Sequence, residues 1–179
     1  MSPMDSAPAI SILMVCMGNI CRSPTAHGVM RARIAARGWQ DLVRVDSCGT
    51  HAYHVGEPAD QRARQHAQRR GYDLSDLRAR QVQPEDFRRH DLILAMDHEN
   101  MARLEQQCPP ALQHKLQLLT HYCSRHRSAT VPDPYYGGTN GFEKVLDLVE
   151  DACDGVLDHL AHLHPQLPRP DSTPGESAK

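Results

Sequence analysis

Two short runs of apolar residues predict strands buried on both faces. Residues 9–15 (AISILMV) and residues 92–96 (LILAM) lack the regular alternation of a strand with one solvated face. Such nearly continuous runs are typical of the inner strands of parallel sheets, which are covered on both sides. Alternation over residues 42–46 predicts a further strand, and residues 115–119 predict an edge strand.

Helical periodicity lies between and after these runs. From Phe142 to Leu163, apolar side chains recur at i, i+3, i+4 and i+7, so one stripe of this helix must pack on an apolar surface. Shorter helices are predicted over residues 24–37, 58–70 and 99–107. The alternation of strands and helices predicts an α/β fold: a single-domain, doubly wound parallel sheet of four strands with helices on both faces.

The two ends of the chain differ from its middle. Residues 165–179 contain four prolines and, as a large apolar side chain, only Leu167, so burial cannot offset the entropy of ordering them. We therefore expect a flexible N-terminus over residues 1–8, one folded domain over residues 9–164 and a disordered tail over residues 165–179. A chain of 179 residues is long enough to bury a stable core without disulfides or bound metal ions.

Composition and charge exclude several function classes. No apolar run approaches the roughly 20 residues that a membrane helix needs, so we expect no membrane partner. A formal net charge of −2 lacks the footprint of a dedicated nucleic-acid binder, so nucleic acid is not an expected partner either. The first residues have no secretory pattern, which favours the cytoplasm. The six cysteines are then expected to be thiols.

The loop between the first strand and the first helix carries the candidate chemistry. Residues 16–24 read CMGNICRSP, which places a cysteine six positions before an arginine. Such a loop offers backbone N–H groups and a helix N-terminus to an anion, and phosphate is the expected ligand. Gly18 and Asn19 suit the tight backbone of a cradle, and Arg22 offers a planar fork to two oxygens. An electropositive loop also favours the thiolate of Cys16, which makes it a candidate nucleophile.

A bare Cys-x5-Arg spacing occurs by chance in many chains, and Cys16 and Cys21 would then be buried thiols beside an ordinary turn. The complete string from Val15 to Pro24, set between a strand and a helix, is far more specific. It resembles the low-molecular-weight protein tyrosine phosphatases. The resemblance extends from Ile10 to Leu163 and includes VDS (45–47), VGEPAD (55–60), LILAMD (92–97) and DPYY (133–136).

The resemblance implies hydrolysis of phosphotyrosine in proteins without a metal or cofactor. Cys16 would attack phosphorus and form a cysteinyl-phosphate, while Arg22 and the loop amides from Met17 to Arg22 hold the phosphate oxygens. Asp133 would be the general acid and then the general base. Substrate contacts are expected from the loop and from an aromatic mouth, namely Met17, Gly18, Asn19, Ile20, Cys21, Ser23, Tyr53, Tyr135 and Tyr136.

Supporting roles follow for residues around the loop. Ser23 would donate a hydrogen bond to the sulfur of Cys16, and Asn19 would anchor the loop with Ser47 and His66 as its partners. Cys21 is close enough in sequence to trap an oxidised Cys16 as a disulfide, which predicts redox control. His27 and Cys48 depart from the family pattern, and neither is expected to touch the proposed chemistry.

Other functions remain open from the residues. An arsenate reductase of the same fold would need two further neighbouring thiols, and residues 74–89 contain none. A protein-arginine phosphatase would carry threonine in place of Ile20. A phosphate-binding module would need neither Cys16 nor Asp133. The twelve histidines show no pattern that completes a metal site. The sequence leaves open a cognate tyrosine kinase as partner, the substrate, and whether the chain is a monomer or a weak homodimer.

Overall fold

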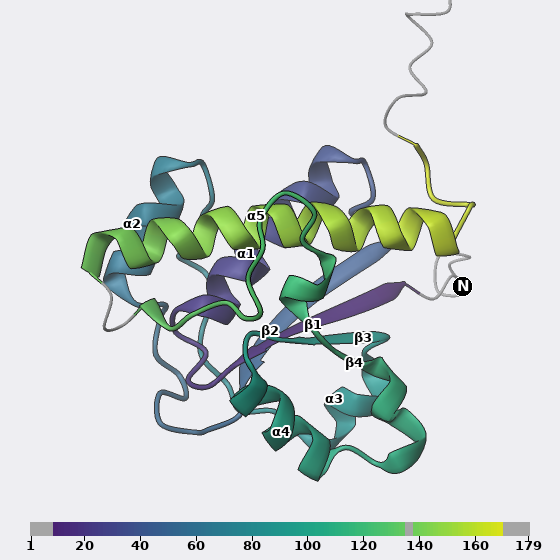
Figure 1. Cartoon of the computed structure of the whole chain (residues 1–179), viewed down its shortest axis with the longest axis horizontal. Helices are drawn as coiled ribbons and strands as arrows, with labels where there is room; N and C mark the ends of the chain where they lie inside the picture. Colours follow the sequence, from purple (N-terminus) through teal and green to yellow (C-terminus); the bar gives the residue numbers. More distant parts are fainter. Residues whose placement is uncertain (1–8, 135–137, 170–179) are drawn as a thin grey trace, which may run out of the picture.

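A four-stranded parallel sheet forms the centre of the molecule, and its strand order is β2-β1-β3-β4 (Figure 1). The computed structural model describes residues 9–134 and 138–169. The strands are β1 (Ile10–Cys16), β2 (Val43–Gly49), β3 (Leu92–Ala95) and β4 (Leu116–Leu118). The predicted fold class is confirmed, because two chain segments wind outward from the central β1 in opposite directions.

Strand β1 is buried on both faces, as its unbroken apolar run predicts. Its alternate side chains enter two separate cores: Ile12 and Met14 belong to one, while Leu13 and Val15 belong to the other. All four side chains are fully buried. Because successive side chains of a strand point to opposite faces, only a strand between two helical layers needs apolar residues at every position.

Helices cover both faces of the sheet (Figure 1). One face is covered by α1 (Arg22–Ala36), α2 (Gln61–Arg69) and α5 (Gly138–Leu163), whose apolar side chains share a core with Ile12 and Met14. The other face is covered by α3 (Pro84–Arg89) and α4 (His98–Gln107), which contribute Phe87 and Leu104. No helix in the described part of the chain is long and apolar enough to cross a bilayer.

Local capping explains where the helices differ from the sequence prediction. Helix α2 begins at Gln61 rather than at residue 58, because the Asp60 carboxylate accepts hydrogen bonds from the N–H groups of Arg62 and Ala63. Helix α3 was not predicted. It has only six residues, and a capping box between Gln83 and Asp86 stabilises its N-terminus. A search for helical periodicity does not detect so short a helix.

The folded body extends beyond the predicted boundary at residue 164. Leu167 is 4% exposed and joins the core, and the indole N–H of Trp39 donates to the Pro168 carbonyl over 2.7 Å. The prediction of a disordered tail is therefore wrong for residues 165–169. One apolar side chain in a polar segment suffices to anchor it when a buried pocket and a buried N–H donor are at hand. The predictions for residues 1–8 and 170–179 lie outside the described residues.

Candidate active site

The loop between β1 and α1 is held from behind by the end of β2. The N–H of Thr50 donates to the Cys16 carbonyl at 2.9 Å, and the N–H of His51 donates to the Met17 carbonyl at 3.0 Å. Gly49 permits this close approach, because a Cβ atom there would lie 2.6 Å from the Met17 carbonyl oxygen. Side chains larger than hydrogen would push the loop away from the strand.

Asn19 gives the loop its turn. It has a φ of 60° and is the one non-glycine residue with positive φ in the described part of the chain. Asparagine tolerates this left-handed conformation better than most residues. Both polar atoms of its side chain make hydrogen bonds: Nδ2 donates to Ser23 Oγ at 2.7 Å, and Oδ1 accepts from the N–H of Arg80 at 3.0 Å.

Cys16, where the loop begins, is buried and only 3% exposed. Sγ accepts a hydrogen bond from the N–H of Asn19 at 3.3 Å and lies 3.0 Å from Ser23 Oγ. Because Asn19 donates to the same hydroxyl, Ser23 is free to direct its single proton outward. Its nearer acceptor is the Cys16 sulfur, since the Cys48 carbonyl lies 3.4 Å away. The site therefore offers hydrogen bonds to a negatively charged sulfur.

Arg22 is fixed beside the sulfur. Its Nη1 donates to Asp97 Oδ2 at 2.7 Å and to the Val131 carbonyl at 2.9 Å, and its side chain is 5% exposed. Burial opposes the charge of Arg22, but Cys16 and Asp97 outweigh it, so the pKa of Arg22 is raised. Among the described residues only Nη1 has partners, so the rest of the guanidinium can face an anion.

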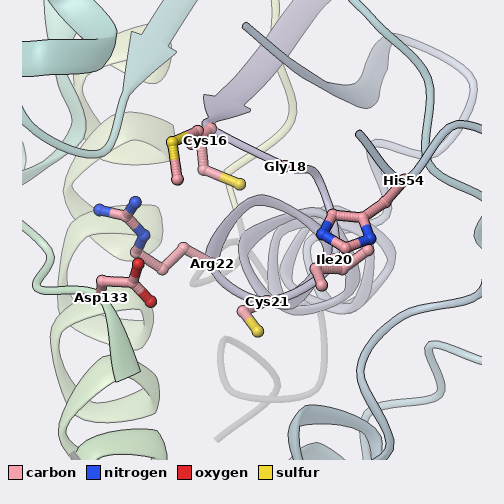
Figure 2. A pocket seen from close by; sticks show the side chains of 8 residues that line it. Cys16, Gly18, Ile20, Cys21, Arg22, His54 and Asp133 are labelled. Atoms are coloured by element: carbon pink, nitrogen blue, oxygen red, sulfur yellow. The ribbon is translucent and has the colours of Figure 1, made fainter. Parts of the chain in front are cut away.

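These side chains surround one cavity of about 230 Å³. It is lined by Cys16, Met17, Gly18, Ile20, Cys21, Arg22, His54 and Asp133. Figure 2 shows Arg22 and Asp133 on one flank and Ile20 and His54 on the other, with Cys16 where β1 ends. The exposed Asp133 follows closely after the fully buried Val131, whose carbonyl binds Arg22. Loop and carboxylate therefore meet at one site although they are far apart in sequence.

Cys21 lines the same cavity as a protonated thiol. Burial, followed by the charge of Asp60, raises its pKa to about 12. Its side chain packs with Ala63 and Phe142 in a small apolar cluster. Cys48 is also buried, and burial raises its pKa well above the ordinary value. Cys16 and Cys21 are both free thiols in this structure.

The predicted support of Asn19 by Ser47 and His66 is corrected. Ser47 Oγ lies 2.9 Å from Nδ1 of His27, which burial keeps neutral by lowering its pKa to about 4. His66 bonds Glu143 through Nδ1 at 2.5 Å, and its ring stacks on Phe142. The sequence did not indicate either pairing, because the direction of a histidine on a helix depends on which helix packs against it.

The predicted aromatic mouth is only partly described. Tyr53 is 72% exposed, its ring stacks on His51 at a centroid distance of 5.2 Å, and it does not belong to the lining of the cavity. His54 lines the cavity instead and lies against Gly18, with Nδ1 3.1 Å from Glu57 Oε1. Tyr135 and Tyr136 lie outside the described residues.

Several residues of the site were missed from the sequence. Asp97 belongs to the motif LILAMD, which predicts no role for it, and its position directly after a buried strand is the signal that could have found it. The main chain of Cys48 also touches the site, because its carbonyl lies near Ser23 Oγ. His27 and His54 are hidden among twelve histidines, and Arg80 among many arginines, so composition gave no signal for these three residues.

The fold and the loop define a class of phosphate-handling α/β proteins, and comparisons with known proteins identify the family. The family model described as "Low molecular weight phosphotyrosine protein phosphatase" matches residues 11–166. A low molecular weight protein-tyrosine-phosphatase of Streptomyces coelicolor is 43% identical over 82% of this chain and 90% of its own length. The human low molecular weight phosphotyrosine protein phosphatase is 36% identical over 83% of this chain and 94% of its length.

The solved structures agree with this result. A protein tyrosine phosphatase from Entamoeba histolytica superposes with a TM-score of 0.84 at 40% identity, covering 86% of this chain and 98% of that chain. The chain belongs to the low-molecular-weight protein tyrosine phosphatase family. The resemblance seen in the sequence is thereby confirmed, and the enzyme class is that of a phosphatase.

Proposed function

We propose that this enzyme hydrolyses phosphotyrosine in proteins in two steps, with Cys16 as nucleophile, Arg22 and the loop amides as phosphate ligands, and Asp133 as general acid and base. The observation that carries the proposal is the single cavity that Cys16, Arg22 and Asp133 line together. The substrate class is supported by the family and by its human member, both of which are phosphotyrosine protein phosphatases by name.

In the first step the Cys16 thiolate attacks phosphorus in line with the phenolic oxygen. The S–P bond forms as the P–O bond to tyrosine breaks, and Asp133 gives its proton to the departing oxygen. Arg22 and the backbone N–H groups of the loop bind the three equatorial oxygens, whose charge they stabilise in the transition state. The products of this step are dephosphorylated tyrosine and cysteinyl-phosphate.

In the second step water attacks the cysteinyl-phosphate. Asp133, now a carboxylate, removes a proton from the water as the O–P bond forms and the S–P bond breaks. The electron pair returns to the Cys16 sulfur, where Ser23 Oγ at 3.0 Å and the N–H of Asn19 at 3.3 Å stabilise the thiolate. Inorganic phosphate then leaves the loop.

The depth of the cavity favours an aryl phosphate. Cys16 is buried whereas Asp133, which lines the same cavity, is exposed, so only a side chain that carries its phosphate well away from the backbone reaches the sulfur. A tyrosine ring provides that reach, whereas serine is shorter. Ile20 gives the ring an apolar neighbour in the cavity wall.

Wild-type protein and Cys16→Ser should be compared on phosphotyrosine, phosphoserine and phosphoarginine peptides, with a reductant and without added metal. We expect turnover of phosphotyrosine by wild type and none by Cys16→Ser, which should still bind inorganic phosphate. Turnover of phosphoarginine in preference would contradict the substrate class. Inactivity on all three peptides would contradict the proposed function and leave arsenate reduction or anion binding.

Cys21 extends the proposal to redox control. If peroxide oxidises Cys16 to a sulfenic acid, the Cys21 thiol displaces water and forms a disulfide, which two-electron reduction by a small thiol reverses. The six free cysteines suit the reducing cytoplasm, where such reductants are supplied. Peroxide-treated wild type should regain activity with a thiol, whereas Cys21→Ser should regain much less because Cys16 oxidises further.

A further inference from the structure

A cluster of charged side chains adjoins the phosphate loop through Asn19 and lies outside the lining of the cavity. This charge cluster consists of Asp46, Arg80, Asp86 and His90. The Arg80 guanidinium makes two parallel hydrogen bonds to the Asp86 carboxylate: Nη1 donates to Oδ2 at 3.0 Å, and Nη2 donates to Oδ1 at 2.9 Å. Nη2 also donates to Asp46 Oδ2 at 2.9 Å.

The main chain of Arg80 contacts the loop and the strand that supports it. Its N–H donates to Asn19 Oδ1 at 3.0 Å, and its carbonyl accepts from the N–H of Gly49 at 2.8 Å. Gly49 packs closely against the loop, because a Cβ there would lie 2.6 Å from the Met17 carbonyl oxygen. One residue therefore binds the carboxylates with its side chain and the active-site loop with its backbone.

Asn19 is the point at which this contact matters. Its left-handed backbone persists only where its surroundings hold it, and its N–H and Nδ2 groups bind the Cys16 sulfur and Ser23 Oγ. A shift of the Arg80 N–H would release Oδ1 of Asn19 and move both donors relative to the sulfur. The position of Arg80 is thus transmitted to the candidate nucleophile through a single side chain.

The charge cluster leaves Arg80 little freedom. The Asp86 side chain is 5% exposed, so its charge must be matched where it stands. His90 Nε2 lies 3.3 Å from Asp86 Oδ1, and its Nδ1 lies 2.6 Å from Ser11 Oγ on β1. Burial opposes the charge of Asp86, but the neighbouring His90 imidazole and the Arg80 guanidinium outweigh it and hold the pKa well below its ordinary range.

We propose that Arg80 is a positioning residue, which uses its two carboxylate partners as an anchor and its main-chain N–H to fix Asn19, and thereby the phosphate loop, in the binding conformation. This inference rests on the proposed function of the loop. It does not place Arg80 among the catalytic residues, because its contact with the sulfur runs through Asn19.

The test compares Arg80→Met and Arg80→Lys with Arg78→Met. Arg78 is the matched control, because it is an exposed arginine two positions away whose guanidinium binds only the carbonyls of Ser75 and Leu77 among the described residues. Two readouts are needed: kcat and KM on an aryl phosphate, and the rise in melting temperature caused by inorganic phosphate. The second follows phosphate affinity without turnover, since a ligand stabilises the fold that binds it.

We expect Arg80→Met to lower kcat/KM by about 10-fold to 100-fold, the size that follows from a small misplacement of reacting groups. Phosphate should raise its melting temperature much less than that of wild type. Arg80→Lys should recover part of both losses, because an ammonium group can meet one carboxylate but not fork across two. Arg78→Met should match wild type in both readouts.

A purely structural role would give a different pattern. Arg80→Met would then melt at a lower temperature but, assayed well below that temperature, would keep wild-type kcat/KM and phosphate response, and the inference would be wrong. If Arg80→Met does not fold, Asp46→Asn replaces it, because the asparagine oxygen still accepts from the Ser47 N–H, while the charge and the oxygen that accepts from Arg80 Nη2 are both lost. Failure of the proposed function differs from both, since wild type and Arg78→Met would be inactive as well.

Discussion

The floor of the site and its rim are built in opposite ways. The floor consists of four buried residues, each of which makes hydrogen bonds to other residues: Cys16, Asn19, Arg22 and Ser23. The rim is exposed: Tyr53 and Val55, which flank His54, are 72% and 57% exposed. The difference follows from what each must bind.

A phosphate group is the same in every substrate, whereas the protein that carries it varies. Donors aimed at phosphate are most effective when they are already in place, because no reorganisation is then needed as charge develops. Contacts to a varying protein surface suit exposed loops on a rigid scaffold. The expectation is that floor changes alter reaction with every substrate, and that rim changes alter some substrates only.

The largest effect should come from Asp133, a rim residue with a role in the chemistry. Asp133→Asn removes the proton donor, so hydrolysis of a phosphate ester with a poor leaving group should slow by about 10²-fold to 10⁴-fold. An ester whose leaving group needs no proton should be affected far less in the first step. Single-turnover measurements across such a series would test this, and equal losses for all leaving groups would contradict the acid role.

His27 tests the burial of the floor through pH. Its pKa is about 4 in the folded protein because burial disfavours the charge, against about 6.5 when unfolded. Between pH 4 and pH 6.5 the unfolded state therefore binds more protons than the folded state. The contribution of His27 to the free energy of unfolding is fully present above about pH 6.5 and falls by roughly 3 kcal/mol as the pH drops toward 4.

Denaturant unfolding at pH 7 and pH 4.5 measures this loss. His27→Gln should lose less stability between the two pH values than wild type, because the buried titrating ring is gone. His162→Gln, at an exposed position near the end of α5, is the control and should behave as wild type. If all three proteins lost the same free energy of unfolding between pH 7 and pH 4.5, His27 would not be the source of the pH dependence.

Gly49 and Gly141 form a matched pair between floor and rim. A Cβ at Gly49 would meet the Met17 carbonyl oxygen at 2.6 Å, whereas a Cβ at Gly141 would meet Pro134 Cα at 3.4 Å. Gly49→Ala should therefore lower kcat/KM by about 10-fold on every substrate, through displacement of the loop. Gly141→Ala should change kcat/KM little, and a larger loss for Gly141→Ala would reverse the comparison.

The smallest effect is expected for Tyr53. The ring is largely exposed, so Tyr53→Ala should raise KM for phosphotyrosine peptides by about 3-fold, the size of one partly buried aromatic contact. Activity on a small aryl phosphate should not change, because that substrate does not extend beyond the cavity, whose lining does not include Tyr53. A fall in kcat on the small substrate would place Tyr53 in the floor rather than the rim.

Local patterns were enough for the elements that determine the fold. Unbroken apolar runs predicted β1 and β3, and a stripe of apolar residues predicted α5, because burial on two faces or on one leaves a distinct period. The loop from Cys16 to Arg22 was found in the same way, since all its residues are contiguous. Helix α3 and the ordered segment up to residue 169 were missed because each depends on a few side-chain contacts.

The sequence by itself determined the α/β class, the phosphate loop and the family, because these depend on neighbours along the chain. Tertiary structure alone decided three pairings at the site: Asp97 with Arg22, Arg80 rather than Ser47 or His66 with Asn19, and His27 with Ser47. These pairs are separated by up to 75 positions, and their contact depends on strand order and helix packing. No local period records which buried side chains meet across a sheet, so that part required the folded molecule.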